Sequence, residues 1–108
     1  MAPAEALRAA AALLADPAKH ATEVMARDMD GLPCDPLARR ARCWCTYGAL
    51  RVSAGTRRAY DAALPHLHDA AFTLFDTSPD EVNDTFGAEI SVGLLLYAAA
   101  LADRATVH

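Results

Sequence analysis

The spacing of apolar residues along the chain predicts four main helices. The first covers residues 3–15, which are rich in alanine and carry leucine on one face. A second covers residues 37–53, because small apolar side chains recur there at helical spacing. A third covers residues 57–75, where we expect the internal proline Pro65 to kink or interrupt the helix. The last covers residues 88–104 and is apolar almost all round, which indicates burial against several neighbours or a homodimer face.

The pattern between the first two helices is weaker and leaves two predictions open. Residues 21–34 alternate weakly between apolar and polar and contain the turn sequence Met29-Asp30-Gly31, which favours a short, irregular β-hairpin. A helix over residues 17–29 is the competing prediction. Further along, Ser78-Pro79-Asp80-Glu81 is typical of a helix start and predicts one short turn before the last helix.

These elements predict a mainly α fold of about four helices, with a short β-hairpin near residues 21–34. The chain has 108 residues, of which 54% are hydrophobic, so it can bury one core of ordinary size. No repeat, linker or low-complexity tract divides it, and we expect a single helical domain over residues 1–108. Helix 37–53 is expected to lie at its centre.

Charge is distributed unevenly, although the net charge is only −4. Residues 37–60 contain six arginines and no acidic residue, while both flanks are acidic. The arginines are Arg39, Arg40, Arg42, Arg51, Arg57 and Arg58. Guanidinium groups suit phosphate oxygens, so segment 39–58 is a candidate phosphate or nucleic-acid surface. Neutralisation by the acidic C-terminal third fits the overall acidity better, and we do not expect nucleic acid as the main partner.

Several classes of protein are not favoured by the sequence. The apolar run over residues 92–102 is shorter than the roughly 18 residues that a membrane span needs, and the N-terminus lacks the basic region of a secretory signal. We therefore expect a cytoplasmic protein with no membrane association. Its three cysteines favour free thiols. No phosphate loop, dinucleotide fingerprint or metal-ligand spacing occurs, so we expect no cofactor and no metal.

One set of residues carries candidate cysteine chemistry. A reactive thiolate at Cys45 would need a nearby imidazole, such as His66 or His68, and Asn83 or Asp84 would orient it. The competing interpretation is that Cys45 is a core residue among small apolar neighbours, and this interpretation is favoured. Asn and Asp are also the commonest capping residues, so structural roles for both are expected.

Two motifs together resemble a known group of proteins. The first is Ala41-Arg42-Cys43-Trp44-Cys45-Thr46-Tyr47-Gly48-Ala49-Leu50, which follows the acidic turn at residues 27–31. The second is Val82-Asn83-Asp84, ahead of the last helix. This chain resembles, over roughly residues 5–103, a family of small uncharacterised proteins found in actinobacterial and phage genomes. The family pattern has an aromatic residue where this chain has Val82. No activity is assigned to the family, but the resemblance implies that Cys45 lies close to Asn83 and Asp84.

The function we expect is that of a small, non-enzymatic, regulatory protein-binding protein. It would act on a protein partner or as a homo-oligomer, for example as an accessory protein or inhibitor encoded by a phage or mobile element. The acidic side chains would take the place of phosphates in a partner that binds nucleic acid. These side chains are Asp76, Asp80, Glu81, Asp84 and Glu89. Two alternatives are an enzyme or thiol sensor using Cys45, and phosphate or nucleic-acid binding through segment 39–58.

Overall fold

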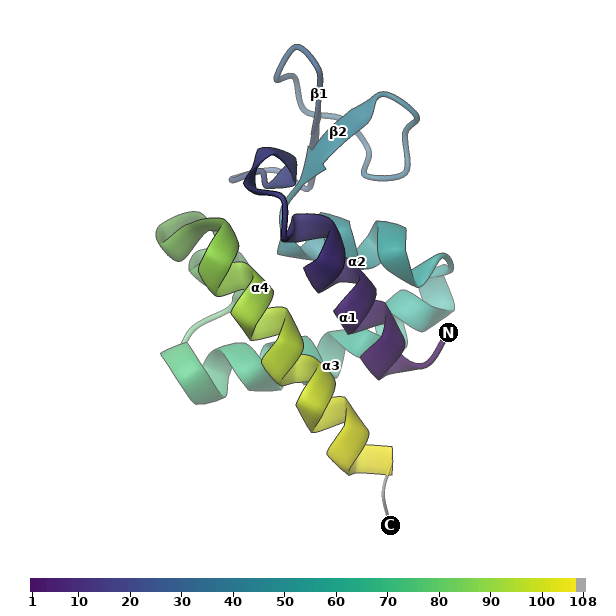
Figure 1. Cartoon of the computed structure of the whole chain (residues 1–108), viewed down its shortest axis with the longest axis vertical. Coiled ribbons are helices and arrows are strands. Elements are labelled where there is room, and N and C mark those ends of the chain that lie inside the picture. Colours follow the sequence, from purple (N-terminus) through teal and green to yellow (C-terminus); the bar gives the residue numbers. More distant parts are fainter. Residues whose placement is uncertain (107–108) are drawn as a thin grey trace.

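The computed structural model describes residues 1–106, and most of them are helical. The elements in chain order are α1 (Pro3–Leu14), η1 (Pro17–Lys19), β1 (Ala26–Asp28), β2 (Ala41–Trp44), α2 (Thr46–Ala54), α3 (Arg57–Phe75) and α4 (Pro79–Thr106). Figure 1 shows the two strands projecting from one end of the four helices. The prediction of a mainly α fold with about four helices and a small hairpin is confirmed.

The core forms where the helices cross. α1 packs along α4 and α2, and α3 packs against α4 (Figure 1). Leu7 and Leu14 of α1 are fully buried, as are Leu95 and Ala98 of α4. Most other core positions are alanines, whose small side chains let the helix axes approach closely. This packing fixes the end of the molecule at which α2, α4 and the strands meet.

The predicted helix over residues 37–53 is wrong in its first half. Residues 41–44 form strand β2, which pairs antiparallel with β1, so that Cys43 lies opposite Arg27. Cys45 has extended backbone angles and caps α2, which begins at Thr46. Helical spacing suggested one continuous face because the inward residue of the strand, Ala41, is as small and apolar as the residues of the helix. The packed centre is therefore built from α1 and α4 rather than from one long helix at 37–53.

The turn predicted at Met29-Asp30-Gly31 is present. The backbone N–H of Gly31 donates to the carbonyl oxygen of Asp28 at 3.0 Å, and Gly31 has a φ of 80° that glycine adopts without strain. A single antiparallel bridge joins Arg27 to Pro33 within the predicted hairpin. The regular partner of β1 is β2, however, after a long connection. The competing helix over residues 17–29 is wrong, since only the three residues of η1 are helical there.

Proline and glycine act differently in the last two helices. α3 runs from Arg57 to Phe75 as predicted, but Pro65 lies inside it without interrupting it. α4 consists of two helical segments joined at Gly87, whose φ of 83° and ψ of −166° are not helical. The turn predicted after Ser78 is thus longer than expected. It places Asn83 and Asp84 on a helical segment at the strand end of the molecule.

α4 also has the length and apolar content of a membrane-spanning helix. Helices in the cores of soluble proteins meet the same criteria, so this is weak evidence. One face of α4 is buried against α1 and α3, including Leu94 and Ala99, while Ile90 and Leu96 are exposed on the other side. Length and composition alone therefore do not exclude a membrane span at α4, and the expectation of no membrane association stays a prediction.

Candidate functional site

The site is organised by Asn83, a polar residue that is 0% exposed. Its side-chain oxygen Oδ1 accepts hydrogen bonds from the backbone N–H of Thr46 at 2.9 Å and from the Thr46 hydroxyl at 2.8 Å. Its Nδ2 donates to the carbonyl oxygen of Ala21 at 3.0 Å and to Asp84 Oδ1 at 2.9 Å. The side-chain amide therefore joins α4 to the start of α2 and to the segment that follows η1.

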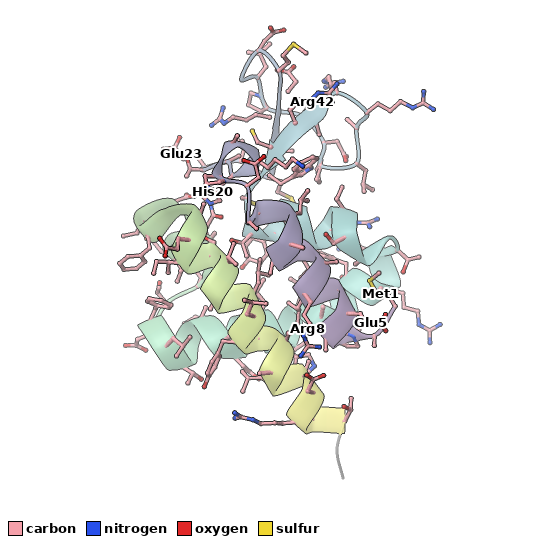
Figure 2. All side chains as sticks on the ribbon, in the orientation of Figure 1. Met1, Glu5, Arg8, His20, Glu23 and Arg42 are labelled. Atoms are coloured by element: carbon pink, nitrogen blue, oxygen red, sulfur yellow. The ribbon has the colours of Figure 1, made fainter. Side chains whose placement is uncertain are left out.

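The partners of Asn83 also fix a proton on His20. A backbone N–H can only donate and a backbone carbonyl can only accept, so Thr46 and Ala21 determine which way the Asn83 amide faces. His20 Nε2 lies 2.8 Å from Asn83 Oδ1 and must donate to it. Figure 2 shows His20 and Glu23 at the end of the molecule where η1 meets the first segment of α4. His20 therefore serves as a donor in this network.

Asp84 holds the same segment from the next position. Its Oδ1 accepts from the backbone N–H of Glu23 at 3.0 Å as well as from Asn83. Glu23 has a φ of 70°, a left-handed conformation that a non-glycine residue adopts only where its surroundings impose it. The Asn83-Asp84 pair thus shapes the backbone between η1 and β1.

Cys45 and Gly48 bring β2, α2 and residue 25 into contact. The Cys45 thiol caps α2 by accepting from the backbone N–H of Gly48 at 3.4 Å, and the Cys45 N–H donates to the carbonyl oxygen of Met25 at 3.1 Å. That oxygen lies where a Cβ on residue 48 would stand, so only glycine fits there. Before the cap, Trp44 Nε1 donates to the carbonyl oxygen of Pro36 at 3.0 Å.

A pocket of about 270 Å³ opens between these segments. Its lining residues are Glu23, Val24, Met25, Cys45, Tyr47, Asp80, Asn83 and Asp84. The proximity of Cys45 to Asn83-Asp84, implied by the resemblance, is therefore observed. The carboxylates of Glu23, Asp80 and Asp84 give the pocket a negative rim, while Val24 and Met25 form an apolar part of its wall.

Burial favours the protonated forms of the Cys45 thiol and the Tyr47 hydroxyl in the pocket wall. Burial raises the pKa of the Cys45 thiol, the Asp84 charge adds to the rise, and the hydrogen bonds from backbone N–H groups oppose it. Burial and the charge of Asp80 raise the pKa of Tyr47 to about 12. The Tyr47 hydroxyl lies 3.0 Å from His68 Nε2, so this histidine contacts the tyrosine and not the thiol.

The chain matches a family of unknown function, DUF6197, over residues 1–101. It belongs to DUF6197. No curated protein and no solved structure matches the chain.

Of the five residues proposed for cysteine chemistry, this DUF6197 protein brings three together. Cys45, Asn83 and Asp84 line one pocket. His66 lies elsewhere, in a groove between α3 and the end of α4 that Arg104 also lines. Among residues 1–106, no hydrogen bond joins a histidine to the Cys45 thiol, and no three potential ligands are placed to hold a metal ion.

The predicted binding residues of the DUF6197 chain are divided between two regions. Asp80 lines the pocket, whereas Glu81 lies outside it and accepts a hydrogen bond from the Thr85 hydroxyl at 3.3 Å. The arginines do not form a continuous surface. Arg39 and Arg40 lie exposed in the loop before β2, and Arg42 is exposed within β2. Arg57 and Arg58 begin α3, and Arg51 lies half-buried in α2.

Neutralisation of these arginines is partial. Arg40 lies 4.0 Å from Asp28, and Arg57 lies 3.0 Å from Asp61 in the next turn of α3. Neither partner belongs to α4, where most of the C-terminal acidic residues lie. The α4 residue Asp103 pairs instead with Arg8 of α1.

The sequence did not indicate a role for His20, Glu23 or Tyr47. His20 and Glu23 lie far from Asn83 in the sequence and carry no motif, whereas Tyr47 lies within the motif at residues 41–50 but was given no role of its own. The available signal was the buried Asn-Asp pair, because a buried amide needs several partners and these must come from other segments. In this chain, the network is therefore the feature that Asn83-Asp84 marks in the sequence.

Proposed function

We propose that the protein is a non-enzymatic binding protein whose acidic pocket receives a positively charged side chain of a protein partner. The observation that carries the proposal is the convergence of Glu23, Asp80 and Asp84 on one pocket with an apolar wall. A lysine or arginine has an apolar stem and a charged head, which match the wall and the rim of this pocket. The negative charge of the pocket also raises the rate of association with a basic partner.

The state of the thiol favours binding over covalent catalysis. Cys45 is 7% exposed, and its pKa is raised by burial. Its sulfur accepts a hydrogen bond from a backbone N–H, while the pocket rim carries carboxylates that oppose formation of a thiolate. The histidine in the network, His20, is engaged by Asn83. The thiol is therefore better suited to capping α2 than to attacking a substrate.

The setting that we propose is the cytoplasm. Cys34, Cys43 and Cys45 are all free thiols in the structure, as is typical of a reducing compartment. We further propose that the Trp-Cys-x-x-Gly-Ala-Leu and Asn-Asp motifs are signatures of the family in actinobacterial and phage genomes. Members would act there as small regulatory or inhibitory partners of basic proteins. Sequences of other members that lacked glycine at position 48 or asparagine at position 83 would contradict this.

The binding proposal is tested with a minimal cationic ligand. Nα-acetyl-arginine amide is titrated into ¹⁵N-labelled protein, and backbone shifts are followed for residues 23–25 and 45–47. Nα-acetyl-citrulline amide, which is neutral and nearly isosteric, is the control ligand. We expect saturable shifts at these positions with the arginine compound, smaller shifts with the citrulline compound, and weaker binding at higher salt.

Single substitutions then test which carboxylate of the pocket rim contributes to binding. Asp80→Asn and Glu23→Gln each remove one rim charge, and neither side chain has a hydrogen bond among residues 1–106. Asp30→Asn removes the same charge from an exposed loop away from the pocket and serves as the control. We expect both pocket variants to bind the arginine compound several-fold more weakly, with the control unchanged. Equal binding by all three variants, or equal binding of citrulline, would overturn the proposal.

A further inference from the structure

A second pocket, which shares only Met25 with the acidic one, lies where the loop before β2 meets α2 and α3. Its volume is about 380 Å³. It is lined by Met25, Asp35, Pro36, Leu37, Arg51, Arg57 and Tyr60. It therefore combines two guanidinium groups with apolar side chains, in contrast to the carboxylate rim of the first pocket.

Arg51 has unused hydrogen-bonding capacity in this pocket. Its side chain lines the pocket, yet the terminal nitrogen Nη1 is buried and has no hydrogen-bond partner within residues 1–106. Arg51 also forms no ion pair among these residues. Buried donors are nearly always paired, because an unpaired one loses its hydration without compensation. The missing partner is an acceptor, and an anionic acceptor would also balance the charge.

Positive charge converges on one aromatic ring beside this donor. The Cζ atoms of Arg51 and Arg57 lie 6.0 Å and 5.8 Å from the centre of the Tyr60 ring. Arg57 also stands in the first turn of α3, at the positive end of the helix dipole, and that turn contains no acidic residue. Asp61 pairs with Arg57 from the second turn, which leaves Arg51 as the guanidinium without a counterion.

We propose that this pocket binds an organic carboxylate whose apolar body rests on Met25, Pro36 and Leu37. A planar carboxylate accepts two parallel hydrogen bonds from one guanidinium, and a change in the last dihedral angles of Arg51 would bring Nη1 to it. Asp35 also lines the pocket, with its Oδ1 already accepting from the N–H of Leu37 at 2.7 Å. A second carboxylate this close favours a ligand with a single negative charge over a doubly charged phosphate.

The first test uses phenylacetate as the probe. Phenylacetamide, its neutral counterpart, and inorganic phosphate are the controls. Binding is followed in the full chain by the Nε–Hε resonances of the arginines and the ring resonances of Tyr60. We expect saturable shifts of Arg51 and Tyr60 with phenylacetate only. Equal shifts with phenylacetamide would overturn the role of charge, and stronger binding of phosphate would overturn the assignment to carboxylates.

The second test separates the site from general charge attraction. Arg51→Gln removes the unpaired guanidinium, and Arg57→Gln removes the exposed one. Arg58→Gln is the control, because Arg58 is exposed in the same helical turn and does not line the pocket. We expect the first variant to weaken phenylacetate binding about tenfold, as for loss of a charge-assisted hydrogen bond. We expect Arg57→Gln to weaken it less and the control to leave it unchanged.

Loss of binding in these variants is distinguished from loss of folding. Thermal unfolding of each variant is measured first. If Arg51→Gln unfolds, Arg57→Gln decides, since that side chain is exposed and its loss leaves the core intact. Unchanged affinity in Arg57→Gln, or an equal loss in Arg58→Gln, would overturn the proposed pocket.

Discussion

The carbonyl oxygen of Met25 occupies the place where any residue other than glycine at position 48 would put its Cβ atom. The same oxygen accepts a hydrogen bond from the N–H of Cys45 at 3.1 Å, so it cannot withdraw without breaking the junction of β2 and α2. Gly48 is therefore required by a backbone contact between distant segments. Its torsion angles are those of an ordinary helical residue.

The first prediction is that Gly48→Ala destabilises the protein although alanine favours helices. The added methyl group must displace the backbone at residue 25, and overpacking of this kind costs about 3 kcal/mol. Gly93→Ala is the matched control, because nothing lies within 4 Å of its added Cβ in α4. We expect this control to gain roughly 0.5 to 1 kcal/mol. Urea denaturation of both variants measures the difference, and equal effects would contradict the steric argument.

The second prediction concerns the buried amide of Asn83. Asn83→Ala leaves the N–H of Thr46, the carbonyl oxygen of Ala21 and the His20 ring without their partner. We expect a loss of roughly 2 to 4 kcal/mol in the free energy of unfolding, because unpaired buried polar groups are costly. Thr85→Ala, an exposed change on the same helical segment, should have little effect. A stable Asn83→Ala variant would show that water replaces the amide.

The sequence allowed most of the helices to be predicted, for physical reasons that differ among them. α3 was predicted at its observed bounds because Thr56 caps it and its apolar residues repeat without interruption. The start of α4 was predicted because Ser78-Pro79-Asp80-Glu81 is typical of a helix start, but the segment that follows continues to Gly87 instead of ending after one turn. These signals are local, and local signals are what a single sequence carries best.

The errors arose where contacts between distant segments decide the structure. β2 is a four-residue strand whose partner precedes it by a long loop, and its cap is a cysteine in place of the usual Ser, Thr, Asp or Asn. The helix start at Thr46 was therefore missed. Within the site, the Asn83-Asp84 motif marked the position, but the identity of His20 as a partner depends on how η1 folds back on α4.

The third prediction is that Cys45 is the slowest of the three cysteines to react. Burial raises its pKa, whereas Cys34 and Cys43 are half-buried. We expect iodoacetamide to modify Cys45 at least about tenfold more slowly than Cys34 in the folded protein, because reaction requires local opening. Mass spectrometry of each cysteine over time measures this, and the rates should converge in urea. Fastest reaction at Cys45 near neutral pH would instead favour the enzyme or thiol sensor.

The fourth prediction is a loss of stability at high pH that depends partly on Tyr47. Its pKa is about 12 in the folded protein, against an ordinary value of 10, so the unfolded chain loses this proton first. Stability from this group is therefore constant below pH 10 and falls as the pH rises from 10 toward 12. Burial also raises the pKa of Cys45 and of Tyr60, which adds a decline in the same direction.

Replacement of the tyrosine isolates its share of this decline. Tyr47→Phe removes the titrating hydroxyl together with its hydrogen bond to His68, so it lowers stability modestly at neutral pH. Between pH 10 and 12, however, its unfolding free energy should fall less steeply than that of the unmodified protein. Urea denaturation at several pH values in this range measures the slope. Tyr97→Phe, a change on α4 outside the pocket, is the control, and an equal change of slope in both variants would contradict the role assigned to Tyr47.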